Sequence, residues 1–178
     1  MSTLKKSLAI ALISAAALAL ITWTINSFEF RSPLFAFLVN WLVLSWVALI
    51  GQISNLHLLP REYYEIKKFE RSGKIYERLG IVWFKKIVRR GPFSILSPKL
   101  KLPREKTPAS LKSLENEMQK IETSHVFIFI LVLPLAGYAL SMHWYDAAAW
   151  LTLFNILFNG YPVLLQRYNR AKLKELIN

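Results

Sequence analysis

Residues 122–144 read ETSHVFIFILVLPLAGYALSMHW, and the polar start of this stretch gives way at Val126 to an apolar run that ends at Met142. A run of about 17 residues is at the lower end of the length that an α-helix needs to cross the hydrocarbon layer of a bilayer. A helix is the expected form, because lipid offers no partner for unpaired backbone groups. Residues 126–142 are therefore predicted to be a transmembrane helix.

Three further apolar runs have the length of a transmembrane helix. They cover about residues 7–25, 33–51 and 147–165. Hydrophobic residues make up 54% of the chain, which is more than an ordinary soluble domain contains. The sequence thus predicts an all-α membrane protein with four transmembrane helices in two hairpins, which forms a single integral membrane domain over residues 1–178.

The first of these runs has a second interpretation. Lys5 and Lys6 followed by an apolar stretch are also typical of a secretory signal peptide. No clear small-x-small cleavage site precedes the polar residues that follow the run, and the run is long for a signal core. A retained membrane anchor is the favoured interpretation, and a cleaved signal peptide is the alternative.

The lysine and arginine residues set the expected orientation. An N-terminus inside the cell places every Lys and Arg except Arg31 on the cytoplasmic side, including those of residues 53–125 and of the tail after Leu165. Because positively charged residues favour the cytoplasmic side, both termini and the middle segment are predicted to be cytoplasmic. Given the net charge of +12, we then expect a membrane surface to be the partner, and we expect no nucleic-acid partner.

The absence of cysteine excludes disulfides, thiolate metal sites and a cysteine nucleophile. The three histidines cannot fill an ordinary metal site without help from carboxylates. We therefore expect no metal centre.

Residues 53–125 are predicted to lie against the membrane rather than to form a separate domain. The stretch GKIYERLGIVWFKKIVRRG, residues 73–91, places apolar side chains from Ile75 to Val88 on one helical stripe and basic side chains on much of the other side. A basic amphipathic helix that carries a Trp commonly lies in the headgroup layer, and packing on the other spans is a compatible alternative. We expect an irregular loop over residues 94–108, and then a helix that continues into the third span.

Glu122 and His125 are three residues apart on this last helix and therefore share a face. A carboxylate next to an imidazole fixes the orientation of the ring and makes it a better base. His125 is therefore a candidate general base at the edge of the membrane, with Glu122 as its orienting partner. The alternative is an amphipathic interfacial histidine beside a solvated glutamate.

Polar residues also gather at the cytoplasmic end of the fourth span. Four side chains fall within about 60° of one another on a regular helix: Asn155, Asn159, Gln166 and Arg170. Amides within a span are costly unless they face protein or a water-filled cavity, and hydrogen bonds between helices are the alternative to a binding site. Gly160 and Pro162 predict a kink that frees carbonyl groups. Because this cluster and the Glu122–His125 pair end at the same leaflet, we expect one shared site.

Three stretches together resemble a known family. They are LPREYYEIKKFERSGKIYERLGIVWFKKIV (residues 59–88), ENEMQKIETSH (115–125) and NGYPVLLQRYNRAKL (159–173). In this order they are similar to the glycosyl-4,4'-diaponeurosporenoate acyltransferases, small bacterial integral membrane proteins of carotenoid biosynthesis. The resemblance covers roughly residues 55–174.

The resemblance implies a bacterial inner-membrane acyltransferase that esterifies a hydroxyl group, expected to belong to a sugar, on a lipid-like acceptor. The acyl donor would be acyl-CoA or an acyl-carrier thioester used as a co-substrate, with no bound cofactor. The implied partners are the lipid bilayer, the acyl donor and a glycosylated lipid or carotenoid acceptor, with a further membrane protein as a possible partner. A direct transfer of the acyl group fits a chain without a cysteine nucleophile.

The matching positions give the candidate residues. His125 is the expected base and Glu122 its orienter, while Asn159 or an arginine is expected to stabilise the oxyanion. The candidates for holding the donor phosphates or the polar part of the acceptor are Arg61, Arg71, Lys74, Gln166, Arg167, Asn169 and Arg170.

Two other classes of protein remain open at this point. One is a non-enzymatic membrane subunit or assembly factor, in which the polar residues of the fourth span contact another chain. The other is a membrane-bound methyltransferase, because small helical methyltransferases have a similar architecture.

Overall fold

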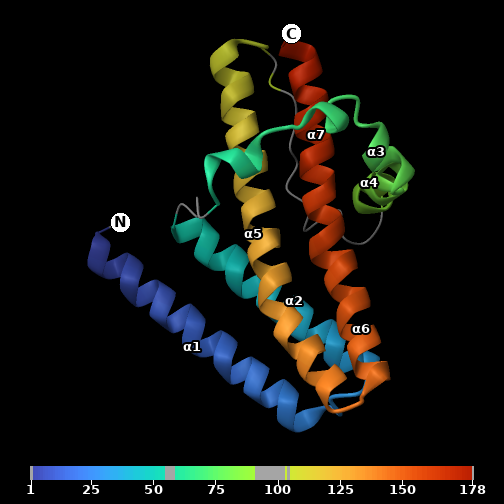
Figure 1. Cartoon of the computed structure of the whole chain (residues 1–178). Coiled ribbons are helices and arrows are strands. Elements are labelled where there is room, and N and C mark those ends of the chain that lie inside the picture. Colours follow the sequence, from blue (N-terminus) through green and yellow to red (C-terminus); the bar gives the residue numbers. More distant parts are fainter. Residues whose placement is uncertain (1, 55–58, 91–102, 104, 178) are drawn as a thin grey trace. The chain divides into compact units, whose positions relative to one another are not determined.

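The computed structural model describes residues 2–54, 59–90, 103 and 105–177 (Figure 1). The α-helices are α1 (Thr3–Ser27), α2 (Pro33–Ile53), α3 (Lys74–Arg78), α4 (Ile81–Arg90), α5 (Pro108–Ser141), α6 (Tyr145–Asn155) and α7 (Tyr161–Ile177). The other helical elements of the described residues are two short 3-10 helices, η1 (Arg61–Tyr64) and η2 (Lys68–Glu70), and the π-helical turn η4 (Ile156–Gly160). No strand occurs in the described part of the chain, which confirms the predicted all-α class.

Among the residues that the structure describes, four helical stretches are long and apolar enough to cross a membrane. They are Thr3–Ser27, Pro33–Ile53, Pro108–Ser141 and Tyr145–Glu175. Each overlaps one of the four spans predicted from the sequence over most of its length, so the protein is a multi-pass membrane protein.

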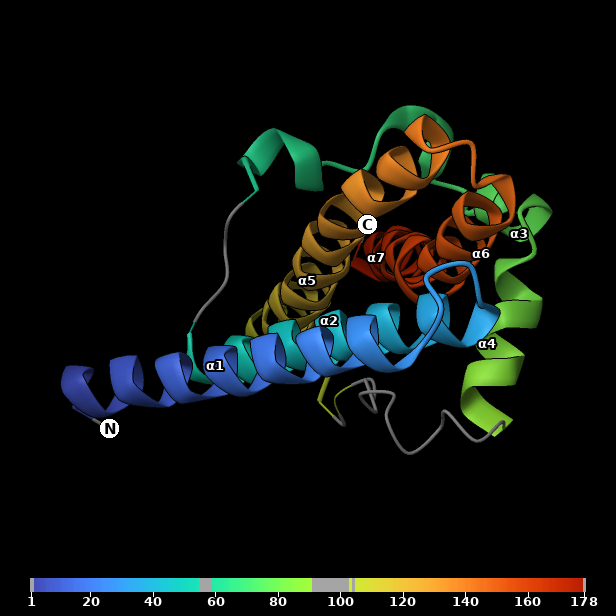
Figure 2. The same ribbon diagram turned by 90° about the horizontal axis from the view of Figure 1, so that it is seen from below.

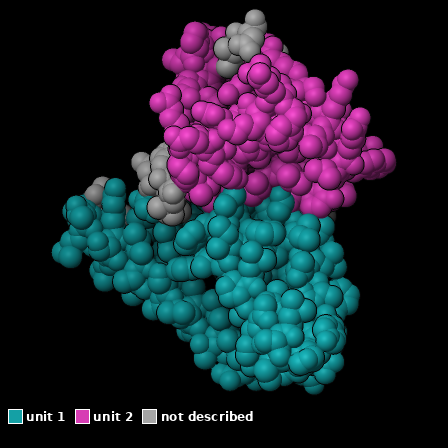
Figure 3. All heavy atoms as spheres, in the orientation of Figure 1, with its two compact units in different colours: residues 1–56, 124–160 teal, residues 57–123, 161–178 magenta. Residues whose placement is uncertain are grey.

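The chain forms two compact units, which Figure 3 shows in different colours. Unit 1 contains residues 1–56 and 124–160, and unit 2 contains residues 57–123 and 161–178. Helix α5 begins in unit 2 and continues into unit 1 without a break, as predicted for the helix that enters the third span. The single domain over the whole chain stays a prediction, and the two units are described separately.

In unit 1, helices α1 and α2 run side by side (Figures 1 and 2). The indole Nε1 of Trp46 donates a hydrogen bond of 3.1 Å to Ser14 Oγ. Helix α1 is otherwise exposed, and Thr24 is its one buried residue within the described part of the chain. An apolar helix that is exposed almost all round is suited to contact with lipid.

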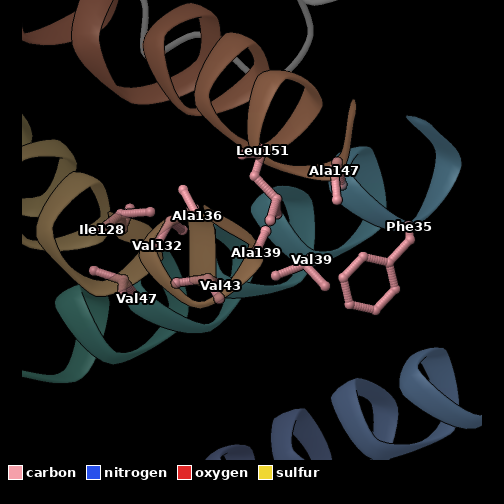
Figure 4. Close-up of a cluster of buried hydrophobic side chains, with 12 residues drawn as sticks. Phe35, Val39, Val43, Val47, Ile128, Val132, Ala136, Ala139, Ala147 and Leu151 are labelled. Atoms are coloured by element: carbon pink, nitrogen blue, oxygen red, sulfur yellow. The ribbon is translucent and has the colours of Figure 1, made fainter. Parts of the chain in front are cut away.

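The core of unit 1 lies between α2, α5 and α6, whose side chains point toward one another in Figure 4. Helix α2 contributes side chains at intervals of four residues, which places them on one face. The labelled core residues are Phe35, Val39, Val43, Val47, Ile128, Val132, Ala136, Ala139, Ala147 and Leu151. The alanines among them let neighbouring helix backbones approach closely, as is typical of packing between membrane helices.

Unit 2 differs from prediction in the amphipathic segment. The single helix expected over residues 73–91 is two helices, α3 and α4, because Gly80 has a φ of +79°. This left-handed backbone conformation ends α3 and is accessible mainly to glycine. Val82, Trp83 and Ile87 are exposed, whereas Tyr76 is buried within unit 2. The irregular loop predicted over residues 94–108 falls mostly outside the described residues.

The fourth span contains a π-helical turn, η4, where the sequence predicts a kink. Pro162 has no N–H, so it cannot donate the usual helical hydrogen bond to the carbonyl of Phe158, four residues earlier. A π-turn is one of the recognised ways in which a helix absorbs such a defect. The helix continues as α7 beyond it.

Two glycines of unit 2 offer a matched test of backbone strain. Gly73 and Gly80 both have positive φ, +70° and +79°. A Cβ on Gly73 would lie 3.0 Å from atoms of Tyr168 and Lys172, whereas a Cβ on Gly80 would meet Tyr161 Oη at an ordinary contact distance of 3.9 Å. Gly80→Ala should lower the free energy of unfolding by about 1–2 kcal/mol through φ strain alone. Gly73→Ala should lower it by about 1–3 kcal/mol more, because of overpacking. Thermal unfolding in detergent measures both, and equal losses would contradict the packing assigned to Gly73.

Candidate functional site

Unit 1 contains a cluster of buried amides, which we call the amide cluster. It consists of Asn40 on α2, Asn155 at the end of α6 and Asn159 in η4, and all three are at most 1% exposed. Asn159 Nδ2 donates to Asn155 Oδ1 at 2.9 Å and to Asn40 Oδ1 at 3.4 Å. The three amides therefore hydrogen-bond to one another in surroundings where neither water nor lipid could provide the partners.

Two backbone carbonyls complete the amide cluster. Asn155 Nδ2 donates to the carbonyl oxygen of Phe129 on α5 at 3.0 Å. Asn40 Nδ2 donates to the carbonyl oxygen of Ala36 on its own helix at 2.9 Å. The amide cluster thus joins α2 and η4 to the part of α5 that lies in unit 1.

His125 is the titratable member of this site. Its Nδ1 lies 3.3 Å from Asn159 Oδ1, and the ring also hydrogen-bonds to the backbone of Phe158. Pro162 has no N–H group to donate to the Phe158 carbonyl. The π-turn therefore supplies both the amide and the backbone group that hold the imidazole.

Unit 2 contains a second polar cluster, which we call the charge cluster: Glu70, Tyr76, Glu122, Arg167 and Arg170. Arg170 Nη1 donates to Glu122 Oε2 at 2.6 Å, and Arg167 Nη1 donates to Glu122 Oε1 at 3.1 Å. The side chains of Glu122 and Arg170 are both completely buried. Burying charges is tolerated here because each is paired and hydrogen-bonded.

Arg167 uses its whole guanidinium group inside unit 2. Its Nε and Nη2 donate to the two oxygens of Glu70 at 2.8 and 2.9 Å, while the remaining N–H groups reach Glu122 and the carbonyls of Tyr63 and Glu65. A guanidinium has five N–H donors, and each of them has an acceptor here. This leaves Arg167 no donor for a ligand.

The ionisation states of Glu70 and Tyr76 follow from their surroundings. Burial tends to raise the pKa of Glu70, but hydrogen bonds from Arg167, Tyr76 and the Lys67 backbone outweigh it and lower the pKa to about 2. Burial and the bond to Glu70 raise the pKa of Tyr76 to about 12. At neutral pH the pair is therefore a carboxylate and a protonated phenol, which is the state that binds Arg167.

Two buried atoms of α7 lack a hydrogen-bond partner among the described residues: Gln166 Oε1 and Arg170 Nε. They belong to residues one helical turn apart, so both lie on one face of α7. One is an acceptor and the other a donor. A hydroxyl group or a water molecule could serve both.

The other predicted binding residues are nearer the surface of unit 2. Arg61, Arg71 and Lys74 are exposed, and no hydrogen bond or ion pair of their side chains occurs with any described residue. Asn169 Oδ1 accepts a hydrogen bond of 3.2 Å from Lys85 Nζ. Within the described ranges, no group of three His, Asp or Glu side chains is placed to hold a metal ion.

The structure differs from the expected pairing of Glu122 with His125. The carboxylate of Glu122 accepts from two arginines, and the amide of Asn159 takes the place next to His125. Glu122 and Gln166–Arg170 come together in unit 2, whereas His125 and Asn159 come together in unit 1. One site shared by both groups stays a prediction.

Sequence reasoning missed three members of these clusters: Asn40, Glu70 and Tyr76. Asn40 was visible as an amide in an otherwise apolar run, which is costly in a membrane and therefore a signal. Glu70 lies in the motif FERSGK that carried the resemblance. Tyr76 had no such signal, because it is in phase with the apolar stripe.

The fold and these sites define a multi-pass, all-helical membrane protein with polar groups buried in both units. The family model described as glycosyl-4,4'-diaponeurosporenoate acyltransferase matches residues 60–178, which is more than half of the chain. The chain belongs to this family and is therefore a membrane acyltransferase of carotenoid biosynthesis. The resemblance stated from the sequence is confirmed. The match contains every predicted site residue, while Asn40 lies outside it.

Comparison with curated proteins and with solved structures finds no match.

The buried ion pair predicts a large effect of one substitution. Glu122→Gln leaves Arg170 as an uncompensated buried charge and should lower the free energy of unfolding by about 3–5 kcal/mol. Glu117→Gln removes a partner from an exposed pair with Lys120 on the same helix and should cost less than about 1 kcal/mol. Chemical unfolding in detergent, followed by circular dichroism, compares the two variants. Similar losses would show that the charge cluster contributes little.

Glu70 predicts an acid-sensitive stability. Its folded pKa of about 2 lies below the ordinary glutamate value of 4.5, so its contribution is complete above about pH 4.5 and is lost as the pH falls toward 2. Glu70→Gln should be less stable at neutral pH and should lose less stability between these limits. Unfolding curves measured at several pH values check this, and parallel pH profiles of the two proteins would contradict it.

Proposed function

We propose that the protein transfers a fatty acyl group from a thioester donor, acyl-CoA or an acyl-carrier protein, to a hydroxyl group of a glycosylated, lipid-like acceptor. His125 is the general base of this reaction. The observation that carries the proposal is the hydrogen bond between His125 and Asn159, which gives the imidazole a neutral partner. Only a neutral imidazole can accept a proton, and an amide partner, unlike a carboxylate, adds no negative charge that would hold the ring in its protonated form.

The proposed reaction is a direct transfer. His125 takes the proton of the acceptor hydroxyl while the hydroxyl oxygen attacks the carbonyl carbon of the thioester. The carbon–sulfur bond then breaks, and the released thiolate receives the proton from His125. No covalent acyl-enzyme is formed, in keeping with a chain that has no cysteine.

Asn159 takes a positioning role in this proposal. Both N–H groups of its amide donate to Asn155 and Asn40. The amide therefore has no donor left for an oxyanion, although the sequence analysis expected it to stabilise one. Its oxygen instead holds the base.

In unit 2, Gln166 and Arg170 are the proposed partners of a hydroxyl of the acceptor, because each has one unpaired atom and the two atoms have opposite polarity. The exposed Arg61, Arg71 and Lys74 are the proposed partners of the donor phosphates, for which free positive charge is required. Arg167 has a structural role in this proposal, because it links Glu70 and Glu122 within unit 2.

The proposed setting is the bacterial inner membrane, with two hairpins and both termini in the cytoplasm. The distribution of lysine and arginine supports this orientation. On α4, Val82, Trp83 and Ile87 are exposed, and Lys86 Nζ lies 5.3 Å from the centre of the Trp83 ring. These features support an amphipathic helix in the headgroup layer, with the apolar side chains toward lipid.

The test uses membranes that contain the full-length protein, labelled acyl-CoA and a glycosylated lipid acceptor. His125→Ala should lower kcat at least about 100-fold, which is the usual contribution of a general base. His143→Ala, at an exposed histidine between α5 and α6, is the matched control and should retain full activity.

Wild-type rates in His125→Ala would rule out His125 as the base. Transfer of a labelled methyl group from S-adenosylmethionine, with no transfer from acyl-CoA, would rule out the acyl donor.

A further inference from the structure

We propose that the amide cluster holds the proton of His125 on Nδ1, so that Nε2 is the atom that acts as the base. Asn155 and Asn40 are then positioning residues, which act on His125 through Asn159. The catalytic consequence rests on the proposed function, whereas the position of the proton does not.

Two backbone carbonyls next to the amide cluster fix the orientation of its amides. A backbone carbonyl only accepts hydrogen bonds. The Phe129 carbonyl therefore faces the NH₂ group of Asn155, and the Ala36 carbonyl faces the NH₂ group of Asn40. In both amides, the oxygen is then the atom left for Asn159.

These two oxygens fix the orientation of the Asn159 amide. Two amide oxygens, of Asn155 at 2.9 Å and of Asn40 at 3.4 Å, accept from the same end of the Asn159 amide. This end must be the NH₂ group, because an oxygen there would face two other oxygens. The opposite end, which lies 3.3 Å from His125 Nδ1, is therefore the oxygen Oδ1.

The orientation of Asn159 in turn fixes the position of the hydrogen on the imidazole. An amide oxygen is an acceptor, so Nδ1 of His125 must carry the hydrogen. A neutral imidazole has one N–H, which leaves the lone pair on Nε2.

In a serine protease, a carboxylate holds the catalytic histidine in the correct tautomer. Here the amide cluster takes that role. There, holding the wrong tautomer costs about 10⁴-fold in kcat. A carboxylate inside a bilayer is expensive, whereas an amide carries no charge and still presents an oxygen to Nδ1. The neutral orienter is therefore suited to a base at the edge of the hydrocarbon.

The distances rank the two positioning residues. Asn155 bonds to Asn159 at 2.9 Å and is itself held by another helix, while Asn40 bonds at the longer distance of 3.4 Å. Loss of Asn155 should therefore affect the tautomer more than loss of Asn40.

The direct test is NMR of the full-length protein in nanodiscs, with isotope-labelled histidine ring nitrogens. His57→Gln and His143→Gln leave His125 as the single histidine. At a pH where the ring is neutral, we expect the Nδ1–H tautomer to dominate. A dominant Nε2–H tautomer overturns the proposal, and this readout needs no activity.

Variants then connect the tautomer to the reaction. Asn155→Leu removes both hydrogen bonds of Asn155, and should give a mixture of tautomers and about a tenfold loss of kcat with little change in KM. Asn155→Asp should restore both, because a buried, neutral carboxyl keeps one donor and one acceptor. Thr24→Val, at a buried hydroxyl that bonds within α1, is the control and should change neither.

The outcomes separate this inference from the proposed function. If His125→Ala abolishes transfer while the Asn155→Leu protein keeps the wild-type tautomer, the positioning role is wrong and the base is retained. If the tautomer responds to Asn155→Leu while His125→Ala remains active, the amide cluster positions the ring as inferred and the proposed function is wrong.

Discussion

One carboxylate between two guanidinium groups ties unit 2 together. Glu122 on α5 accepts from Arg167 and Arg170 on α7, and Arg167 extends the connection to Glu70 in the segment before α3. Because these charges are largely removed from water, each depends on its partners, and loss of one leaves another uncompensated. The positions of three chain segments therefore depend on one set of ion pairs, which is why residues that look like ligands of an anionic substrate are already occupied.

Unit 1 also buries polar side chains, but those of its amide cluster carry no charge. Asn40, Asn155 and Asn159 satisfy one another and two backbone carbonyls. The one titratable side chain in contact with them is His125, in the part of the chain that the structure describes. Charged groups stabilise one unit and neutral amides the other, so the two clusters have different chemical tasks. We assign structural cohesion to the charge cluster and positioning of the base to the amide cluster.

The sequence predicted the features that depend on local pattern. The apolar runs predicted four spans, and the continuous series of helix formers before Val126 predicted that α5 runs into the third. The break at Gly80 was missed because the apolar stripe continues in phase on both sides of it. The partners of Glu122 were missed for another reason: helical spacing brings it near His125, but the two arginines reach it from residues more than 40 positions further along the chain. Tertiary contacts of this kind leave no trace in local spacing.

The order of the charges along the chain has a consequence for biosynthesis. Both acidic members of the charge cluster precede the arginines that neutralise them, Glu70 by 97 residues and Glu122 by 45 and 48. A ribosome therefore releases the carboxylates long before it translates α7. Until then, Glu70 and Glu122 lack the two arginines with which they pair in the folded unit 2. The ion pairs of unit 2 can therefore form only after α7 has been synthesised, so this helix completes the charge cluster during biosynthesis.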